Sequence, residues 1–203
     1  MLPRIKNLLL LVILFAVGCS FFKTNASYEG SKKKLRLNLK KWEEFRIDGI
    51  VEINVSSFQI RKTIVVRKNS QAIRADVIDS GLFGMRPSPI VSVYFDSLLV
   101  VKSPDYPFLE NMADESLGKG TELLKIMDSL KEKEAEILST YSTIVDSIKV
   151  EFDQDFDITS INRNRQIITI EYDFKKEPNK ITFFNKRKES ANIRIDRITR
   201  DKI

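Results

Sequence analysis

The sequence predicts a mainly β fold (α+β): a curved antiparallel sheet, or half-open β-barrel, with an N-terminal helix and a central helical segment covering its apolar face. Three observations lead to this prediction. Apolar and polar residues alternate with a period of two from residue 45 to residue 102, a charged helical stretch follows at 121–140, and the alternation resumes at 148. Alternation of this kind is typical of strands with one buried face.

The first block of the predicted sheet contains about five strands. Its clearest run places Phe45, Ile47, Gly49, Val51 and Ile53 on one face, with polar side chains between them. Further runs at 58–66, 73–77, 91–95 and 98–102 are separated by short turns. Strands that follow one another with short turns favour an antiparallel meander over βαβ units.

Two helical segments are expected around this block. Leu35, Leu39, Trp42 and Phe45 have helical spacing and predict a short helix that leads into the sheet. Between Thr121 and Thr140 the apolar residues form one stripe, namely Leu123, Leu124, Met127, Leu130, Ile137 and Leu138. An amphipathic helix in a β protein commonly covers a face of the sheet.

The second block contains about four predicted strands. They lie near 148–152, 168–172, 181–184 and 192–198, with turns at 162–164 and 178–179. We detect no repeat of fixed period, so residues 35–203 are predicted to form a single domain.

The N-terminus predicts export and lipid attachment. Arg4 and Lys6 precede an apolar run from Leu8 to Val17, which is about half the ~20 residues that a membrane-spanning helix needs. Ala16-Val17-Gly18-Cys19 then resembles the lipobox of bacterial prolipoproteins, and Cys19 is the only cysteine of the chain. We therefore expect a signal peptide at 1–18, a diacylglycerol on Cys19 and a flexible tether at 19–34. An ordinary signal peptide that ends near a free cysteine is the alternative.

The composition argues against most enzyme classes. The chain has no histidine, which removes the commonest general base and the Ser-His-Asp triad, and its single cysteine is expected to be acylated. The acidic stretch 151–157 contains no turn glycine and no closing glutamate, so a solvated turn is favoured over a calcium loop. We expect no enzyme, no cofactor, no metal and no nucleic-acid partner. The net charge of +6 is widely spread, and the cluster Lys32 to Lys34 suits either anionic headgroups or a solvated linker.

Several stretches of the chain resemble the LolA/LolB lipoprotein-carrier family. Trp42-x-x-Phe45-x-x-Asp48-Gly49 is similar to that family's entry into its first long strand, and Ser80 to Gly84 stands where the anchored member has an apolar-Gly loop. The stretch from Ile167 to Ile198 resembles the family's final strands. The resemblance, strongest for the anchored LolB type, implies an apolar cavity for acyl chains, a periplasmic carrier as partner, and insertion of lipoproteins at the outer membrane.

The resemblance and the alternation together suggest candidate site residues. Ile53, Ile64, Val77 and Val93 alternate toward one face of their strands and are expected to line the cavity, and Leu82 and Phe83 are candidates for a loop that touches the membrane. Ser20 lacks the aspartate that signals inner-membrane retention, so the periplasmic face of the outer membrane is the expected location. Two alternatives remain open. In the first, the core is filled and the protein is an envelope interaction or sensor lipoprotein. In the second, Leu82 and Phe83 fold inward and do not touch the membrane.

Overall fold

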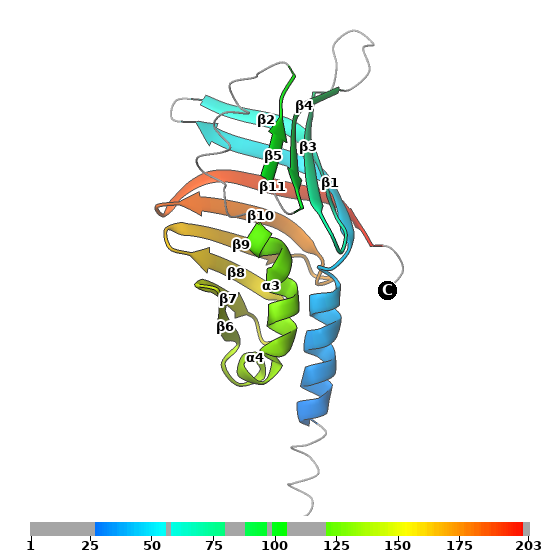
Figure 1. Cartoon of the computed structure of the whole chain (residues 1–203), viewed down its shortest axis with the longest axis vertical. Coiled ribbons are helices and arrows are strands. Elements are labelled where there is room, and N and C mark those ends of the chain that lie inside the picture. Colours follow the sequence, from blue (N-terminus) through cyan, green and yellow to red (C-terminus); the bar gives the residue numbers. More distant parts are fainter. Residues whose placement is uncertain (1–26, 56–57, 80–87, 97–98, 105–120, 201–203) are drawn as a thin grey trace, which may run out of the picture.

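The computed structural model describes residues 27–55, 58–79, 88–96, 99–104 and 121–200 (Figure 1). Cys19, Leu82 and Phe83 lie outside these residues, so their predicted roles stay predictions. Of residues 55, 58, 99 and 121–125 only the backbone is described.

The described strands form a single antiparallel sheet, which confirms the predicted mainly β fold. The sheet has eleven strands in the order β5-β4-β3-β2-β1-β11-β10-β9-β8-β7-β6. Their bounds are β1 (Phe45–Val55), β2 (Phe58–Lys68), β3 (Ile73–Asp79), β4 (Ser88–Phe95), β5 (Leu99–Lys102), β6 (Ser142–Val145), β7 (Ile148–Phe152), β8 (Ile158–Arg163), β9 (Gln166–Tyr172), β10 (Pro178–Asn185) and β11 (Lys188–Thr199).

The sheet is curved and remains open, with β5 and β6 at its two edges (Figure 1). The first and last strands meet at its centre, where β1 pairs with β2 on one side and with β11 on the other. Val51 lies opposite Ile193 of β11 in this central pairing. The pairing therefore joins an upper half, made of β1 to β5, to a lower half, made of β6 to β11.

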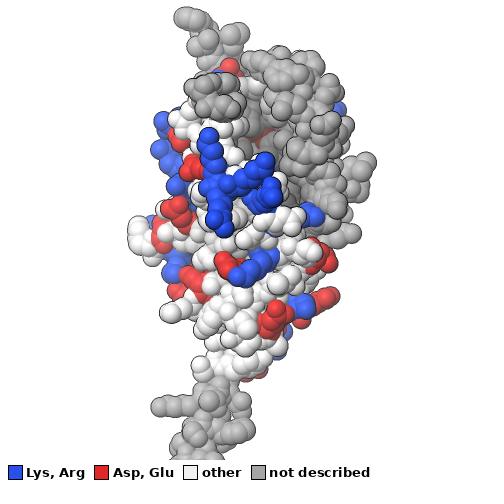
Figure 2. Space-filling view, turned by 90° about the vertical axis from the view of Figure 1, so that its left-hand side faces the viewer, with Lys and Arg blue, Asp and Glu red and all other residues white. Residues whose placement is uncertain are grey.

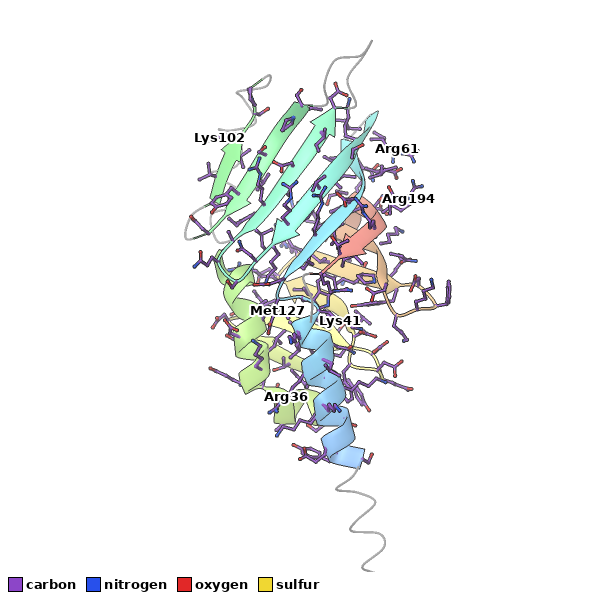
Figure 3. The ribbon with its side chains drawn as sticks, turned by 90° about the vertical axis from the view of Figure 1, so that its right-hand side faces the viewer. Arg36, Lys41, Arg61, Lys102, Met127 and Arg194 are labelled. Atoms are coloured by element: carbon purple, nitrogen blue, oxygen red, sulfur yellow. The ribbon has the colours of Figure 1, made fainter. Side chains whose placement is uncertain are left out.

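The described helices all lie beside the lower half of the sheet. An N-terminal helix (27–40), α3 (Thr121–Glu132) and α4 (Glu134–Thr140) contribute Leu35, Leu39, Leu130 and Ile137 to a core that also contains strand residues from β6 to β9. These four leucine and isoleucine side chains are at most 1% exposed. Figure 3 shows the N-terminal helix, marked by Arg36, beside α3, marked by Met127.

The N-terminal helix begins earlier and ends earlier than the sequence predicted. Residues 27–34, expected to belong to the tether, are already helical, and ion pairs join them to distant parts of the fold. Lys34 pairs with Asp155 and Lys32 with Glu134. The helix ends at residue 40, and Trp42, in the following turn, packs edge-on against Phe45 with ring centroids 5.6 Å apart.

The central helical segment also differs from its prediction. The single helix expected from 121 to 140 is divided at Lys133, whose backbone leaves the helical region with φ −97° and ψ 16°. The Lys133 N–H donates to the Leu130 carbonyl at 3.2 Å, a tighter turn than the α-helical one. The break lets α4 turn so that Ile137 enters the lower core.

Candidate functional site

A second apolar cluster lies on the inner face of the upper half and of the adjoining strands β10 and β11. Val51, Ile64 and Ile193 are buried there, and partly buried apolar residues pack around them, namely Ile53, Val66, Val77, Ile181, Phe183 and Ile195. All nine come from β1, β2, β3, β10 and β11. Within the described ranges, no helical residue belongs to this cluster, in contrast to the lower core.

The strand register decides which side chains share this face. Ile64 lies opposite Val77, and the neighbouring pair on β3 and β4 is Ala75 and Val93. The structure thus brings Ile53, Ile64 and Val77 into one cluster and places Val93 on the same face, near the sheet edge. The sequence pattern could not orient all of these strands, because two of them are apolar on both faces.

The inner face also contains a charged pair that the sequence analysis missed. Lys62 lies opposite Val51, and its Nζ donates to Asp79 Oδ1 at 2.7 Å. Its spacing of two residues from Ile64 is a signal that could have placed it there. The apolar strip therefore ends in an amine and a carboxylate, at the end of the strands where β3 finishes.

The outer face of the upper half is polar and carries a shallow depression of about 520 Å³ near the β2–β3 turn. Arg46, Arg67, Lys68 and Arg74 line it, but three of these cations form ion pairs with Asp48 or Asp76. The Arg46 guanidinium, followed by that of Arg197, lowers the pKa of Asp48. Lys68 donates to the Glu43 carbonyl at 2.7 Å, and burial lowers its pKa. Each of these four cations thus already has a partner within the fold, so none of them is free to bind an anion in the depression.

The acidic stretch 151–157 has a structural role in the described fold. Asp153 Oδ1 accepts the backbone N–H groups of Asp155 and Asp157 at 2.8 and 2.9 Å. Lys34 and Lys176 hydrogen-bond the Asp155 carboxylate and lower its pKa to about 2. Since Lys34 belongs to the N-terminal helix, this turn fixes the helix to the sheet. Among the described residues, no three histidine, cysteine or acidic side chains are grouped to hold a metal ion.

No family model matches the chain, and no curated protein is similar to it in sequence. Among solved structures, the chain is similar to a LolA superfamily protein from Nitrosomonas europaea, at a TM-score of 0.45 and 8% sequence identity. The match covers 85% of this chain and 94% of that one. A likeness of this degree assigns neither a family nor an activity, so the chain's function has to be inferred from its own residues.

None of the described helices is long and apolar enough to cross a bilayer.

Proposed function

We propose that this chain is a lipid-anchored, non-enzymatic protein of the bacterial envelope that binds acyl chains on the inner face of its upper sheet. It accepts lipoproteins from a periplasmic carrier and inserts them at the outer membrane. One observation supports this function above the others: an apolar face, centred on Val51, Ile64 and Ile193, whose cluster contains no described helical residue.

The chemistry of this face suits an amphiphile. An acyl chain gains ~0.8 kcal/mol for each methylene removed from water, so about a dozen methylenes gain about 10 kcal/mol before the costs of association. Lys62 and Asp79 at the end of the strip supply polar groups where the head of such a ligand would lie. A dry apolar surface with a few polar groups is the usual form of a lipid site.

Enlarging the proposed cavity wall tests the function directly. We expect Val77→Phe and Val93→Phe to weaken displacement of a fluorescent fatty acid while leaving the melting temperature nearly unchanged, because the added rings occupy ligand space. In a filled core the same enlargement costs ~1–3 kcal/mol. Val100→Phe is the matched control, since Val100 is 39% exposed and lies opposite Tyr94 on the outer face.

Loss of stability in both variants, together with a wild-type protein that never binds the probe, would contradict the carrier function. The protein would then be an interaction or sensor lipoprotein with a filled core.

The anchor is tested separately at Cys19. We expect Cys19→Ala to abolish incorporation of radiolabelled palmitate and to leave an unprocessed or released protein, because the thiol is the proposed acceptor of the diacylglycerol. Fractionation of the cell envelope gives the location. Ser20→Ala is the matched control and should be labelled like the wild type. Palmitate that still enters the Cys19→Ala protein would rule out this anchor.

A further inference from the structure

Two hairpin tips lie against each other on one side of the sheet. The β8–β9 tip consists of Asn164 and Arg165, and the β10–β11 tip consists of Lys186 and Arg187, as the flanking pairs show. The backbone N–H of Lys186 donates to the Arg165 carbonyl at 2.8 Å. This hydrogen bond joins the two tips into one surface, which we call the basic tips.

The basic tips concentrate positive charge. Residues 163–165 and 186–188 contribute five cations and no carboxylate, namely Arg163, Arg165, Lys186, Arg187 and Lys188. The next acidic residue, Glu189, accepts a hydrogen bond from Asn192 at 2.8 Å. Figure 2 faces the side toward which the tips point and shows Lys and Arg side chains gathered there.

Four of these cations are exposed and unpaired among the described residues: Arg165, Lys186, Arg187 and Lys188. Elsewhere on the sheet, arginines such as Arg46 and Arg74 pair with carboxylates at 2.8 to 2.9 Å. The basic tips therefore keep a local excess of positive charge, because these four side chains form no ion pair within the described part of the chain.

The backbone conformation of the β10–β11 tip is unfavourable for long side chains such as those of lysine and arginine. Lys186 and Arg187 have φ values of 51° and 67°, the left-handed conformation that a two-residue hairpin turn of type I′ requires at both positions. Asparagine and glycine adopt it most readily, and long side chains do so at a cost. The sequence thus places two cations where local stability favours Asn-Gly, so the turn itself does not require these charges.

We propose that the basic tips dock on the headgroups of anionic phospholipids at a membrane surface. The cations lie on two exposed turns, which suits an extended negative surface better than a single small anion. Flexible lysine and arginine side chains adapt to mobile headgroups, and clusters of this size bind anionic bilayers. The surface is separate from the apolar inner face, so this inference does not depend on acyl-chain binding.

Vesicle binding tests the proposal in the full chain carrying Cys19→Ala, which removes the covalent lipid. Phosphatidylcholine vesicles measure the contribution of the apolar N-terminus, and vesicles of equimolar phosphatidylglycerol and phosphatidylcholine add the charge. We expect the parent protein to bind the anionic vesicles more tightly than the neutral ones. The triple change Arg165→Gln, Lys186→Asn and Arg187→Gly should weaken binding to the anionic vesicles on the order of 100-fold, because each cation contributes roughly fivefold. Asn and Gly suit the turn, so this variant keeps the fold.

A matched variant separates position from net charge. Lys133→Gln, Lys149→Gln and Lys180→Gln remove the same number of charges away from the tips, where each lysine pairs with a surface glutamate. This variant should retain most of the anionic binding. Equal loss in both variants would overturn the proposal, because net charge alone would then explain it.

Unchanged vesicle binding in the tip variant would also overturn it and leave an acidic protein as the partner to test. A chain that docks on anionic vesicles but never binds the fatty-acid probe would contradict the proposed function and support the basic tips.

Discussion

Gly49→Ala is expected to destabilise the domain by about 3 kcal/mol or more, at the upper end of the overpacking range. Gly49 is buried in β1, where the pairing with β11 shifts register between Asp48 and Gly49. A Cβ at this position would lie 2.2 Å from the Arg194 carbonyl oxygen, which is backbone and cannot rotate away. Urea unfolding measures the effect, and the central β1–β11 pairing has to shift to accommodate even one methyl group.

Gly30→Ala is the matched control for this substitution. Gly30 lies in the N-terminal helix, and a Cβ there meets nothing within 4 Å. Alanine should therefore stabilise the domain by roughly 0.5–1 kcal/mol, the difference in helix propensity. If both glycines tolerated alanine equally well, β1 and β11 could not approach as closely as described.

Most strands could be predicted because their alternation is local. The sequence analysis nevertheless missed two strands. It assigned the end of β8 (Ile158–Arg163) to a turn at 162–164, and it missed β6, whose Ser142–Val145 segment is short. The hairpin that joins it to β7 turns at Asp146 and Ser147, both with positive φ, and lacks the Asn-Gly signal of such turns. The strand is held by pairing with β7 and by burial of Thr143 and Val145, which are tertiary effects.

The start of the N-terminal helix depends on contacts that no local pattern reveals. Residues 27–34 are polar and lack an apolar stripe, so the sequence favours a tether. Lys34 pairs with Asp155, and Arg36 with Glu134, across 121 and 98 positions of the chain. Because only the folded sheet and α4 bring these carboxylates close, the extra helical turns could not be predicted.

The candidate site could be predicted only in part, because it too depends on tertiary contacts. Alternation placed Ile53, Ile64, Val77 and Val93 on inward faces, but it did not show which half of the sheet the helices cover. That depends on α3 and α4 packing with the N-terminal helix on the lower half. The contribution of Lys62 and Asp79 to the inner face depends on the β2–β3 register, which the turn residues alone do not fix.

The described helices contribute side chains to the lower core and none to the upper cluster. We therefore expect the loss of a side chain to cost more stability in the lower core than in the upper cluster. We expect Ile137→Ala to destabilise the domain by about 2–5 kcal/mol, because Ile137 is 0% exposed and packs among helix and strand residues that cannot collapse into the space. Its backbone also ends α4, since the Tyr141 N–H donates to the Ile137 carbonyl at 2.9 Å. Thermal and urea unfolding both report the loss.

Ile53→Ala removes the same atoms from the upper face and should cost less than half as much. Ile53 is only partly buried, and its cluster partners among the described residues all come from the sheet, so truncation leaves little new cavity. The same change should weaken fatty-acid binding, because it removes apolar surface from the ligand. A loss of stability as large as that of Ile137→Ala would mean that protein atoms enclose Ile53 completely, and an acyl chain would then have no place beside it.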